Sequence, residues 1–343
     1  MIIVIKKDTT ADQIEQLLSR LKKANTIPLP VYNGQQTIIV LSGETDNLPL
    51  KNILSIECVE TANRISAPYK LASRSTKSED TIIEVKGIKI GGKHLAMMAG
   101  PCSVESLEQM EMAAENLKKA GANILRAGAF KPRTTPYSFQ GLGLEGLKIL
   151  KKVGDKYNMP TITEVLDPRD VELVEEYADI FQIGARNMQN FRLLEAVGKA
   201  KKPVMLKRGM NATIKELLLA AEYILSNGNM NVMLCERGIR TFETETRNTL
   251  CLATVPLVQK LSHLPIIVDP SHGTGNPDCI PAMTYAAIAA GANGIMIEVH
   301  PNPEEALSDA DQALTIGKFN EIMDTAKPII KAVGKHIDPL PNQ

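Results

Sequence analysis

From about residue 94 onward, short apolar runs recur along the chain, and an amphipathic stretch follows each of them. The eight runs are Leu95–Ala99, Asn123–Gly128, Pro160–Val165, Asp179–Gly184, Pro203–Lys207, Asn231–Cys235, Pro265–Asp269 and Gly294–Val299. Leu107–Ala120 and Thr213–Ser226 are two intervening segments with helical spacing. Nearly continuous apolar strands that alternate with helices predict a parallel sheet. Eight such units over about 240 residues fit a closed (β/α)8 TIM barrel, with an open doubly wound sheet as the structural alternative.

The first 70 residues show a different order of elements. The predicted elements are strand Ile2–Ile5, a helix over 11–24 that Thr9 or Thr10 caps, strands Ile27–Tyr32 and Thr37–Leu41, a weak helix near Asn47 and strand Ile53–Val59. Asn33-Gly34 is a strong turn signal between the second and third strands. The order β-α-β-β-α-β predicts a small ferredoxin-like α+β domain.

These patterns divide the chain into three expected parts. The ferredoxin-like domain covers residues 1–70, a linker and β-hairpin cover 71–93, and the catalytic barrel covers 94–343. Residues 66–80 are polar and predict the linker, and Thr81–Ile90 predicts the hairpin.

Composition narrows the class of protein. The chain has 343 residues, and 39 Lys and Arg residues balance 39 Asp and Glu residues. This balance argues against intrinsic disorder, a general nucleic-acid binder or a polybasic membrane protein. The N-terminal apolar run is too short for a signal-peptide core, and no stretch approaches the ~18 apolar residues of a membrane span. Because the five cysteines are odd in number and widely spaced, we expect reduced thiols and a cytoplasmic location.

Basic residues gather where the predicted strands end, which is where TIM barrels hold their active sites. The six that do so are Arg126, Lys131, Arg133, Arg186, Lys207 and Arg237. Because side chains on apolar strands have limited exposure, this cluster predicts an anionic ligand. Phosphates and carboxylates are the natural anions, since Arg binds them in bidentate fashion and Lys binds them as a point charge.

A second set of residues at the strand ends could hold a metal ion. Cys102, His272 and Glu298 follow the first, seventh and eighth strands, which are neighbours once a barrel closes. Asp309 lies in the loop after the eighth strand. A thiolate, an imidazole and carboxylates suit a divalent transition metal better than Mg²⁺ or Ca²⁺. His300 competes as a ligand, because two-residue alternation places it on the same strand face as Glu298.

Several longer motifs occur at these strand ends in a characteristic order. They are Gly100-Pro101-Cys102-Ser103, Lys131-Pro132-Arg133-Thr134, Gln182-Ile183-Gly184-Ala185-Arg186-Asn187, Leu206-Lys207-Arg208-Gly209, Cys235-Glu236-Arg237-Gly238 and Asp269-Pro270-Ser271-His272. Together they resemble the motifs of 3-deoxy-D-arabino-heptulosonate 7-phosphate (DAHP) synthases. The N-terminal unit resembles the ferredoxin-like regulatory domain that some members of this family carry.

The resemblance implies a transferase of the shikimate pathway. Its members condense phosphoenolpyruvate with D-erythrose 4-phosphate and water in a metal-dependent, aldol-type reaction that gives DAHP and phosphate. This is the first step of aromatic amino acid biosynthesis. The resemblance also implies feedback regulation by an aromatic amino acid at the N-terminal domain, and a homotetramer.

The resemblance also implies roles for individual residues. A divalent ion such as Mn²⁺, Fe²⁺, Co²⁺ or Zn²⁺ is held by Cys102, His272, Glu298 and Asp309. The carboxylate region of phosphoenolpyruvate is held by Arg126, Lys131 and Lys207, and its phosphate by Arg186, Arg237 and the backbone near Ala185. Erythrose 4-phosphate is faced by Arg133 and Thr134. One departure is Asn276-Pro277-Asp278, where many relatives carry a basic residue.

Two further roles follow from placement at strand ends. Lys131 is the candidate proton donor to the aldehyde oxygen, and Glu164 is a candidate to position water.

The nearest rival function is 3-deoxy-D-manno-octulosonate 8-phosphate synthase, with arabinose 5-phosphate as acceptor. The motif that begins at Lys131 argues against it, because that family typically has Ala-Asn after the lysine. A Schiff-base aldolase that uses Lys207 and a non-enzymatic metabolite-sensing protein are two more distant rivals.

Overall fold

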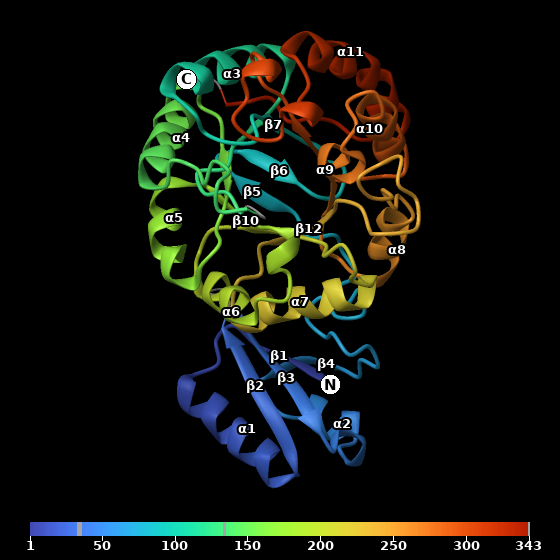
Figure 1. Cartoon of the computed structure of the whole chain (residues 1–343). Helices are drawn as coiled ribbons and strands as arrows, with labels where there is room; N and C mark the ends of the chain where they lie inside the picture. Colours follow the sequence, from blue (N-terminus) through green and yellow to red (C-terminus); the bar gives the residue numbers. More distant parts are fainter. Residues whose placement is uncertain (33–35, 133–134, 342–343) are drawn as a thin grey trace.

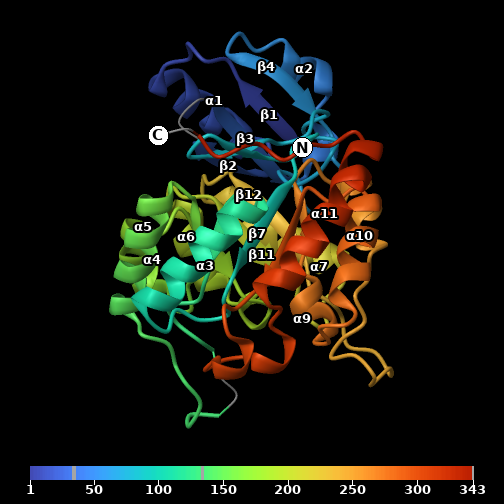
Figure 2. The ribbon, with the colours of Figure 1, turned by 90° about the horizontal axis from the view of Figure 1, so that it is seen from above.

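The computed structural model describes residues 1–32, 36–132 and 135–341. Figure 1 shows a ring of helices around a barrel of strands, with a small sheet attached near α6 and α7. In Figure 2 the long loops that follow the barrel strands project from one end, and the N-terminal sheet lies toward the other. The Asn33-Gly34 turn of the predicted N-terminal domain lies outside the described residues.

The N-terminal sheet has the predicted ferredoxin-like order. Its elements are β1 (Ile2–Ile5), α1 (Ala11–Lys23), β2 (Thr26–Tyr32), β3 (Thr37–Gly43), the 3-10 turn η1 (Thr45–Asn47), α2 (Leu50–Leu54) and β4 (Val59–Asn63). The strands pair antiparallel in the order β2-β3-β1-β4. Helix α1 begins at a capping box in which Thr10 and Gln13 bond each other's backbone N–H groups. Residues of β1, β3, α1 and α2 form a separate apolar core, which includes Ile3, Leu17 and Ile39.

The predicted strand Ile53–Val59 is wrong in its position. Ile53 belongs to helix α2, and the strand begins only at Val59. Pro49 immediately precedes the helix, with a φ of −59°. Leu50 and Ile53 are three residues apart, so both can contact the domain core from one helical face. The apolar residues of this segment therefore follow the helical period and not the strand period.

The predicted linker is more tightly packed than its polarity indicates. Leu71 and Ala72 are buried. The Glu222 carboxylate of helix α7 (Ile214–Ser226) accepts the backbone N–H groups of Lys70, Leu71 and Ala72 at 2.8, 2.8 and 3.0 Å. One barrel side chain thus fixes the backbone that leaves the N-terminal domain.

The eight predicted barrel strands are all present. They are β7 (Ala96–Gly100), β8 (Ile124–Arg126), β9 (Thr161–Glu164), β10 (Ile180–Ile183), β11 (Val204–Lys207), β12 (Val232–Glu236), β13 (Ile266–Val268) and β14 (Gly294–Glu298). They pair in parallel and in sequence, and β14 pairs with β7 to close the barrel. The closed TIM barrel is therefore confirmed, and the open doubly wound sheet is excluded.

Helices cover the outside of this barrel (Figure 1). In addition to α7, they are α3 (Leu107–Ala120), α4 (Leu144–Tyr157), α5 (Val171–Tyr177), α6 (Phe191–Lys199), α8 (Thr254–Leu261), α10 (Ile280–Ala289) and α11 (Ile316–Ala332). A short helix, α9 (Pro270–Thr274), directly follows β13, and 3-10 turns occur at η2 (Pro168–Asp170), η3 (Ala185–Asn187), η4 (Pro303–Glu305) and η5 (Ala310–Gln312).

A β-hairpin closes one end of the barrel, as the Thr81–Ile90 pattern predicts. Its strands are β5 (Ile83–Val85) and β6 (Ile88–Ile90), which pair antiparallel. The four apolar hairpin side chains are buried in the same cluster as the inward-facing side chains near the start of the barrel strands: Ala96, Met98, Ile124, Ile162, Ile180, Met205, Met233, Cys235, Ile267 and Met296. The barrel is therefore filled and capped at its N-terminal end, and ligands must enter from the other end.

Candidate active site

Two-residue alternation along the barrel strands builds the site. The inward-facing apolar residues include Met98, Ile124, Ile162, Ile180, Met205, Cys235, Ile267 and Met296. Two residues further along the same strands come Gly100, Arg126, Glu164, Gln182, Lys207, Arg237, Asp269 and Glu298. Because every second side chain of a strand points to the same face, these later residues face the barrel axis too. Six of these eight residues are charged, so the inward-facing side chains change from apolar to mostly charged within two residues of each strand.

Glycine at the end of β7 allows this crowding. Gly100 has a φ of +152°, and a Cβ atom there would overlap the backbone oxygen of Arg126. Any side chain at this position would push apart β7 and β8. The Gly-Pro-Cys-Ser motif thus turns the chain sharply, so that Cys102 lies beside the barrel mouth.

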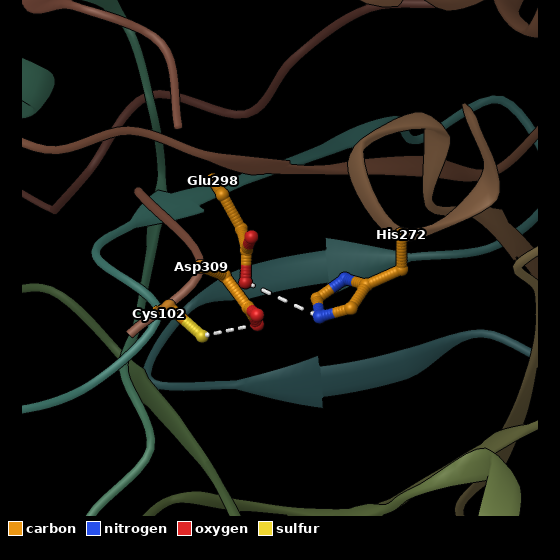
Figure 3. A group of neighbouring side chains, drawn as sticks. All are labelled: Cys102, His272, Glu298 and Asp309. Carbon is orange, nitrogen blue, oxygen red and sulfur yellow. Dashed lines mark hydrogen bonds and ion pairs between the residues drawn. The ribbon is translucent and has the colours of Figure 1, made fainter. Parts of the chain in front are cut away.

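Four donors with metal-ligand chemistry meet at this mouth (Figure 3). Their ligand atoms, from Cys102, His272, Glu298 and Asp309, all lie within 4.8 Å of one another. Cys102 Sγ is 3.1 Å from Asp309 Oδ2, and His272 Nε2 is 3.2 Å from Glu298 Oε1. The structure therefore brings together the four residues that the sequence analysis selected as metal ligands.

His300 does not join this group. Its Nε2 atom lies 3.0 Å from Gln109 Nε2 and 3.4 Å from Glu105 Oε2, and its Nδ1 atom accepts the backbone N–H of Asn302. Both ring nitrogens are thus engaged in the loops that surround the site. His272, and not His300, therefore lies in the group of four donors.

Asp269 holds His272 in a defined orientation. Its Oδ2 atom lies 2.8 Å from His272 Nδ1 and 2.5 Å from Lys207 Nζ. Burial would raise the pKa of Asp269, but the charges of His272 and Lys207 outweigh it and lower that pKa well below its usual range. A permanently ionised carboxylate on Nδ1 makes that nitrogen the protonated one, which leaves Nε2 with its lone pair directed at the metal-ligand group.

The Glu298 carboxylate is buried and still ionised. It accepts hydrogen bonds from Arg126, at 2.9 Å, and from Gln312. Burial would raise its pKa, but His272, Arg126 and Lys131 together lower it to about 2. Arg126 also donates to the carbonyl oxygen of Pro101. Arg126 therefore acts on the carboxylate, and it is not among the residues that line the cavity described below.

Cys102 and Lys131 form a close pair. Lys131 Nζ lies 2.8 Å from Cys102 Sγ and donates to the Cys102 carbonyl oxygen at 3.0 Å. Burial raises the pKa of the Cys102 thiol to about 12, so a metal ion must displace its proton. Burial lowers the pKa of Lys131, but the interactions with Cys102 and with the charge of Glu298 together outweigh it, and the net shift is upward. Thiolate, imidazole and two carboxylates fit a divalent transition metal.

A cavity of about 410 Å³ adjoins this group. Among the predicted site residues, those that line it are Lys131, Glu164, Ala185, Arg186, Lys207, Arg237, His272 and Asp309. Arg133 and Thr134 lie outside the described residues. The Glu164 carboxylate lies against Gly184, where a Cβ atom would overlap Glu164 Oε1. Gln182 donates to the other oxygen of this carboxylate at 3.3 Å.

Arg237 lines the cavity and has one buried hydrogen-bond donor without a partner. The residue is 8% exposed, and among the described residues its buried Nη1 atom has no hydrogen-bond partner. Burial lowers the pKa of Arg237, and the nearby Arg247 and Arg186 lower it further, although Asp269 opposes this. Because an unpaired buried donor is costly, this arrangement favours an anion bound at the cavity.

The sequence analysis missed part of the cavity wall. Arg240, Arg247 and Asn248 also line it. They belong to the irregular loop between β12 and α8, where neither the helical nor the strand period predicts a direction for a side chain. The available signal was the recurrence of arginine: Arg240 follows Arg237 by three residues, and Arg247 follows Arg240 by seven.

A buried network behind the wall positions Arg237. Glu236 is fully buried, and its Oε2 atom accepts from Arg208 at 2.8 Å and from Thr254 at 2.7 Å. Its Oε1 atom accepts the backbone N–H of Gly238 at 2.7 Å. Strand alternation separates this network from the cavity, because Lys207 and Arg237 face inward whereas Arg208 and Glu236 face outward. Glu236 therefore braces the backbone on both sides of Arg237.

Comparisons with known proteins agree with this geometry. Residues 75–333 match the family model described as the DAHP synthetase I family, and residues 1–67 match that of the DAHP synthase ferredoxin-like domain. The chain belongs to the DAHP synthetase I family. The resemblance inferred from the strand-end motifs is thereby confirmed, for the barrel and for the N-terminal domain.

Individual relatives place the chain within this family. A phospho-2-dehydro-3-deoxyheptonate aldolase from Thermotoga maritima is 47% identical over 98% of this chain and 100% of its own length. The crystal structure of the DAHP synthase from that organism matches with a TM-score of 0.79 and 46% identity, over 98% of this chain and 99% of that chain. A truncated form matches with a TM-score of 0.74 and 48% identity, over 79% of this chain and 99% of that one.

The rival octulosonate family is more distant. A 2-dehydro-3-deoxyphosphooctonate aldolase from Acidithiobacillus ferrooxidans is 31% identical over 69% of this chain and 90% of its own length. The match with the Thermotoga protein is therefore both closer and more complete. The chain is an enzyme of the DAHP synthase class, and this class is generally metal-dependent.

Proposed function

We propose that the cavity binds phosphoenolpyruvate and D-erythrose 4-phosphate beside a metal ion held by Cys102, His272, Glu298 and Asp309. The activity is that of a DAHP synthase: the two substrates and water give DAHP and phosphate, in the first step of the shikimate pathway. The observation that carries the proposed site is Arg237, which has a buried, unpaired Nη1 atom and lines one cavity together with Arg186, Lys207, His272 and Asp309.

The charges of the cavity wall suggest how phosphoenolpyruvate lies. Its phosphate binds Arg186 and Arg237 near the backbone of Ala185, because a guanidinium group can donate two parallel hydrogen bonds to phosphate. Its carboxylate lies toward Lys131 and Lys207. Arg126, which is paired with Glu298, contributes positive charge near the phosphoenolpyruvate carboxylate. Arg133 and Thr134 remain the proposed contacts of erythrose 4-phosphate.

The chain's own residues then support bond formation. The enol carbon of phosphoenolpyruvate attacks the aldehyde carbon, and Lys131 supplies a proton to the aldehyde oxygen. Water adds at the adjacent carbon, positioned by Glu164, and phosphate leaves with its C–O bond broken. Fixed cations around the phosphate stabilise the charge that develops on departure. A divalent ion such as Mn²⁺, Fe²⁺, Co²⁺ or Zn²⁺, when bound at the four donors, supplies Lewis acidity toward a carbonyl oxygen.

Phosphate release from the two substrates tests this site, with Cys102→Ala as the variant. We expect turnover to fall by about a thousandfold, on the order of 4 kcal/mol, and chelation of the wild type to have a similar effect. Cys235→Ala is the matched control, because Cys235 is also a buried cysteine of the barrel interior but belongs to the apolar cluster. Near-normal turnover of Cys102→Ala would contradict the ligand assignment. Preference for arabinose 5-phosphate would support the octulosonate function.

We further propose that residues 1–70 are a regulatory domain, 71–93 connect it, and 94–343 form the catalytic unit. Ile2 and Val31 of the N-terminal sheet are buried in the same apolar cluster as barrel residues, and Glu222 clamps the connecting backbone. A ligand such as tyrosine or phenylalanine at this domain can act only by binding two arrangements differently. Deletion of residues 1–70 should keep turnover and abolish inhibition by the amino acid. Equal sensitivity of the truncated enzyme would refute the regulatory role.

The remaining proposals concern assembly and location. We propose a homotetramer in the cytoplasm. No described helix is long and apolar enough to cross a membrane. Light scattering of the purified full-length chain measures the subunit number directly, and a monomer or dimer would refute the tetramer.

A further inference from the structure

A second group of metal-ligand side chains lies at the other end of the barrel. His94 lies two residues before the first barrel strand, and His336 and Asp338 lie in the C-terminal tail after α11. His94 Nδ1 is 2.9 Å from Asp338 Oδ2, and His336 Nε2 is 3.3 Å from Asp338 Oδ1. One ligand atom from each residue lies within 4.8 Å of the others. This group is separate from the four donors at the barrel mouth.

The backbone holds the two histidines next to each other. His94 and His336 form an isolated parallel bridge. The N–H of Leu95 donates to the carbonyl oxygen of His336 at 2.8 Å, and the N–H of His336 donates to that of Lys93 at 3.0 Å. The ring centroids are 4.6 Å apart. Main-chain bonds thus hold the backbones of the two histidines side by side, and their rings meet there.

Asp338 is fixed by a different set of contacts. Its Oδ2 atom accepts the backbone N–H of Lys89, in hairpin strand β6, at 3.0 Å. Its carbonyl oxygen accepts from Asn123 Nδ2 at 3.3 Å. The carboxylate therefore joins the hairpin, the start of the barrel and the C-terminal tail at one point.

These distances suit a small tetrahedral ion. Bonds of about 2 Å to nitrogen and oxygen in tetrahedral geometry separate neighbouring ligand atoms by about 3.3 Å. Both histidines lie near that distance from the same oxygen, since Asp338 Oδ1 is 3.0 Å from His94 Nδ1 and 3.3 Å from His336 Nε2. Two imidazoles and one carboxylate are a donor set typical of Zn²⁺, which also accepts water as a fourth ligand. The His336 side chain is 54% exposed, whereas His94 and Asp338 are 19% and 16% exposed, so an ion can enter from solvent.

We propose that His94, His336 and Asp338 bind Zn²⁺ and thereby fasten the C-terminal tail to the first barrel strand and the hairpin. The site lies at the closed end of the barrel, so the ion takes no part in the reaction. Binding to the folded state alone stabilises that state, and the stabilisation grows with the logarithm of the zinc concentration once this exceeds the dissociation constant. The attachment of the C-terminal tail to the barrel is therefore stronger when zinc is bound.

Metal stoichiometry of the full-length protein tests the proposal. After removal of metals by a chelator, wild type dialysed against Zn²⁺ should hold two ions per chain, and Cys102→Ala should hold one. Cys102→Ala/His336→Gln should hold none. In Cys102→Ala, Zn²⁺ should raise the melting temperature, and this rise should vanish with His336→Gln. Retention of one ion by the double variant, or loss of all zinc from Cys102→Ala alone, would overturn the proposal.

Further variants separate ligand loss from misfolding. Asp338→Asn should also abolish the second ion, whereas Asp324→Asn, an exposed aspartate on α11, should retain it. Replacement of Zn²⁺ by Co²⁺ in Cys102→Ala should give the visible absorption of a tetrahedral site, and His336→Gln should remove it. Phosphate release by the single His336→Gln variant should remain within twofold of wild type. A spectrum that is unchanged by His336→Gln would refute the assignment even if both variants fold.

Discussion

The two ends of the barrel use the same eight strands for opposite purposes. At the start of the strands the inward side chains are Met, Ile, Ala and Cys, and the hairpin β5–β6 covers them. Two residues later the inward positions hold Arg126, Glu164, Lys207, Asp269 and Glu298 among others. All are buried, but the cavity lies only at the second set, where Glu164 and Lys207 line it. Stability and chemistry are therefore separated along the barrel axis by one step of strand alternation.

The largest expected effect of a single change at the charged end is on the rate. Lys131→Ala should lower kcat by about 10² to 10⁴-fold, because a positioned proton donor contributes that much. Lys335→Ala is the matched control at the closed end, where Nζ donates to the carbonyl oxygen of Gly92. Steady-state phosphate release measures both variants. Near-normal kcat for Lys131→Ala would remove this residue as the proton donor.

At the closed end the expected effect is on stability. Ile88 is fully buried in the hairpin, and Ile88→Ala should lower the free energy of unfolding by about 2–5 kcal/mol through lost burial and a cavity. Ile82→Ala is the control, since Ile82 is 50% exposed just before the hairpin strand. Urea unfolding measures the difference. The folded Ile88→Ala enzyme should keep kcat within twofold, and a large loss of kcat would show that the two ends are coupled.

The closed end should also give a pH dependence of stability. His263, which precedes β13, bonds Thr81 through Nδ1 and the carbonyl oxygen of Leu71 through Nε2. Burial is the main cause that lowers its pKa to about 4, against about 6.5 in the unfolded chain. The native state favours the neutral ring, so its contribution is complete above pH 6.5 and is lost as the pH falls toward 4. The loss is about 3 kcal/mol.

Denaturant titrations at pH 7.5 and pH 4 measure this loss. His263→Gln cannot take up a proton, so the stability difference between wild type and variant should shrink by about 3 kcal/mol at the lower pH. A difference that is the same at both pH values would show that His263 is not the titrating group.

The smallest expected effect tests the brace behind the charged end. Glu236→Gln keeps the shape but removes the charge that Arg208 and Gly238 share, at a cost of about 1.5–3 kcal/mol for hydrogen bonds to a charged group. Because Glu236 acts through Arg237, the KM for phosphoenolpyruvate should rise about tenfold or more while kcat changes less. Glu172→Gln, an exposed glutamate on α5, is the control. A fall in kcat alone, with an unchanged KM, would argue against a positioning role.

Strong periodic patterns made most of the fold predictable. The strands of the barrel are apolar on both faces, and helices α3 and α7 begin and end within one residue of the predicted bounds. The pattern failed at Ile53–Val59, where a few apolar residues can follow either period and the contact with the domain core decides between them. It also presented 66–80 as a free linker, although Glu222, about 150 residues away, fixes this segment.

The candidate site was predictable to the extent that it depends on strand ends. Cys102, His272 and Glu298 follow strands that must be neighbours in a closed barrel, so the sequence brings them together. Asp309 and His300 differ only in how their loops turn, and no local pattern encodes that. Arg247 and Asn248 lie in a loop of irregular backbone, and their place at the cavity could not be foreseen.

By itself, the sequence determined the order of elements, the closed barrel, the sign of charge at its mouth and the family. These follow from alternation and local spacing, which neighbouring residues set. The tertiary structure alone decided which histidine joins the metal-ligand group and that Arg126 pairs with Glu298. It also brought His94 to His336 and Asp338 across more than 240 positions of the chain. Such contacts depend on how separate elements pack, and the local sequence around each residue carries no signal of that packing.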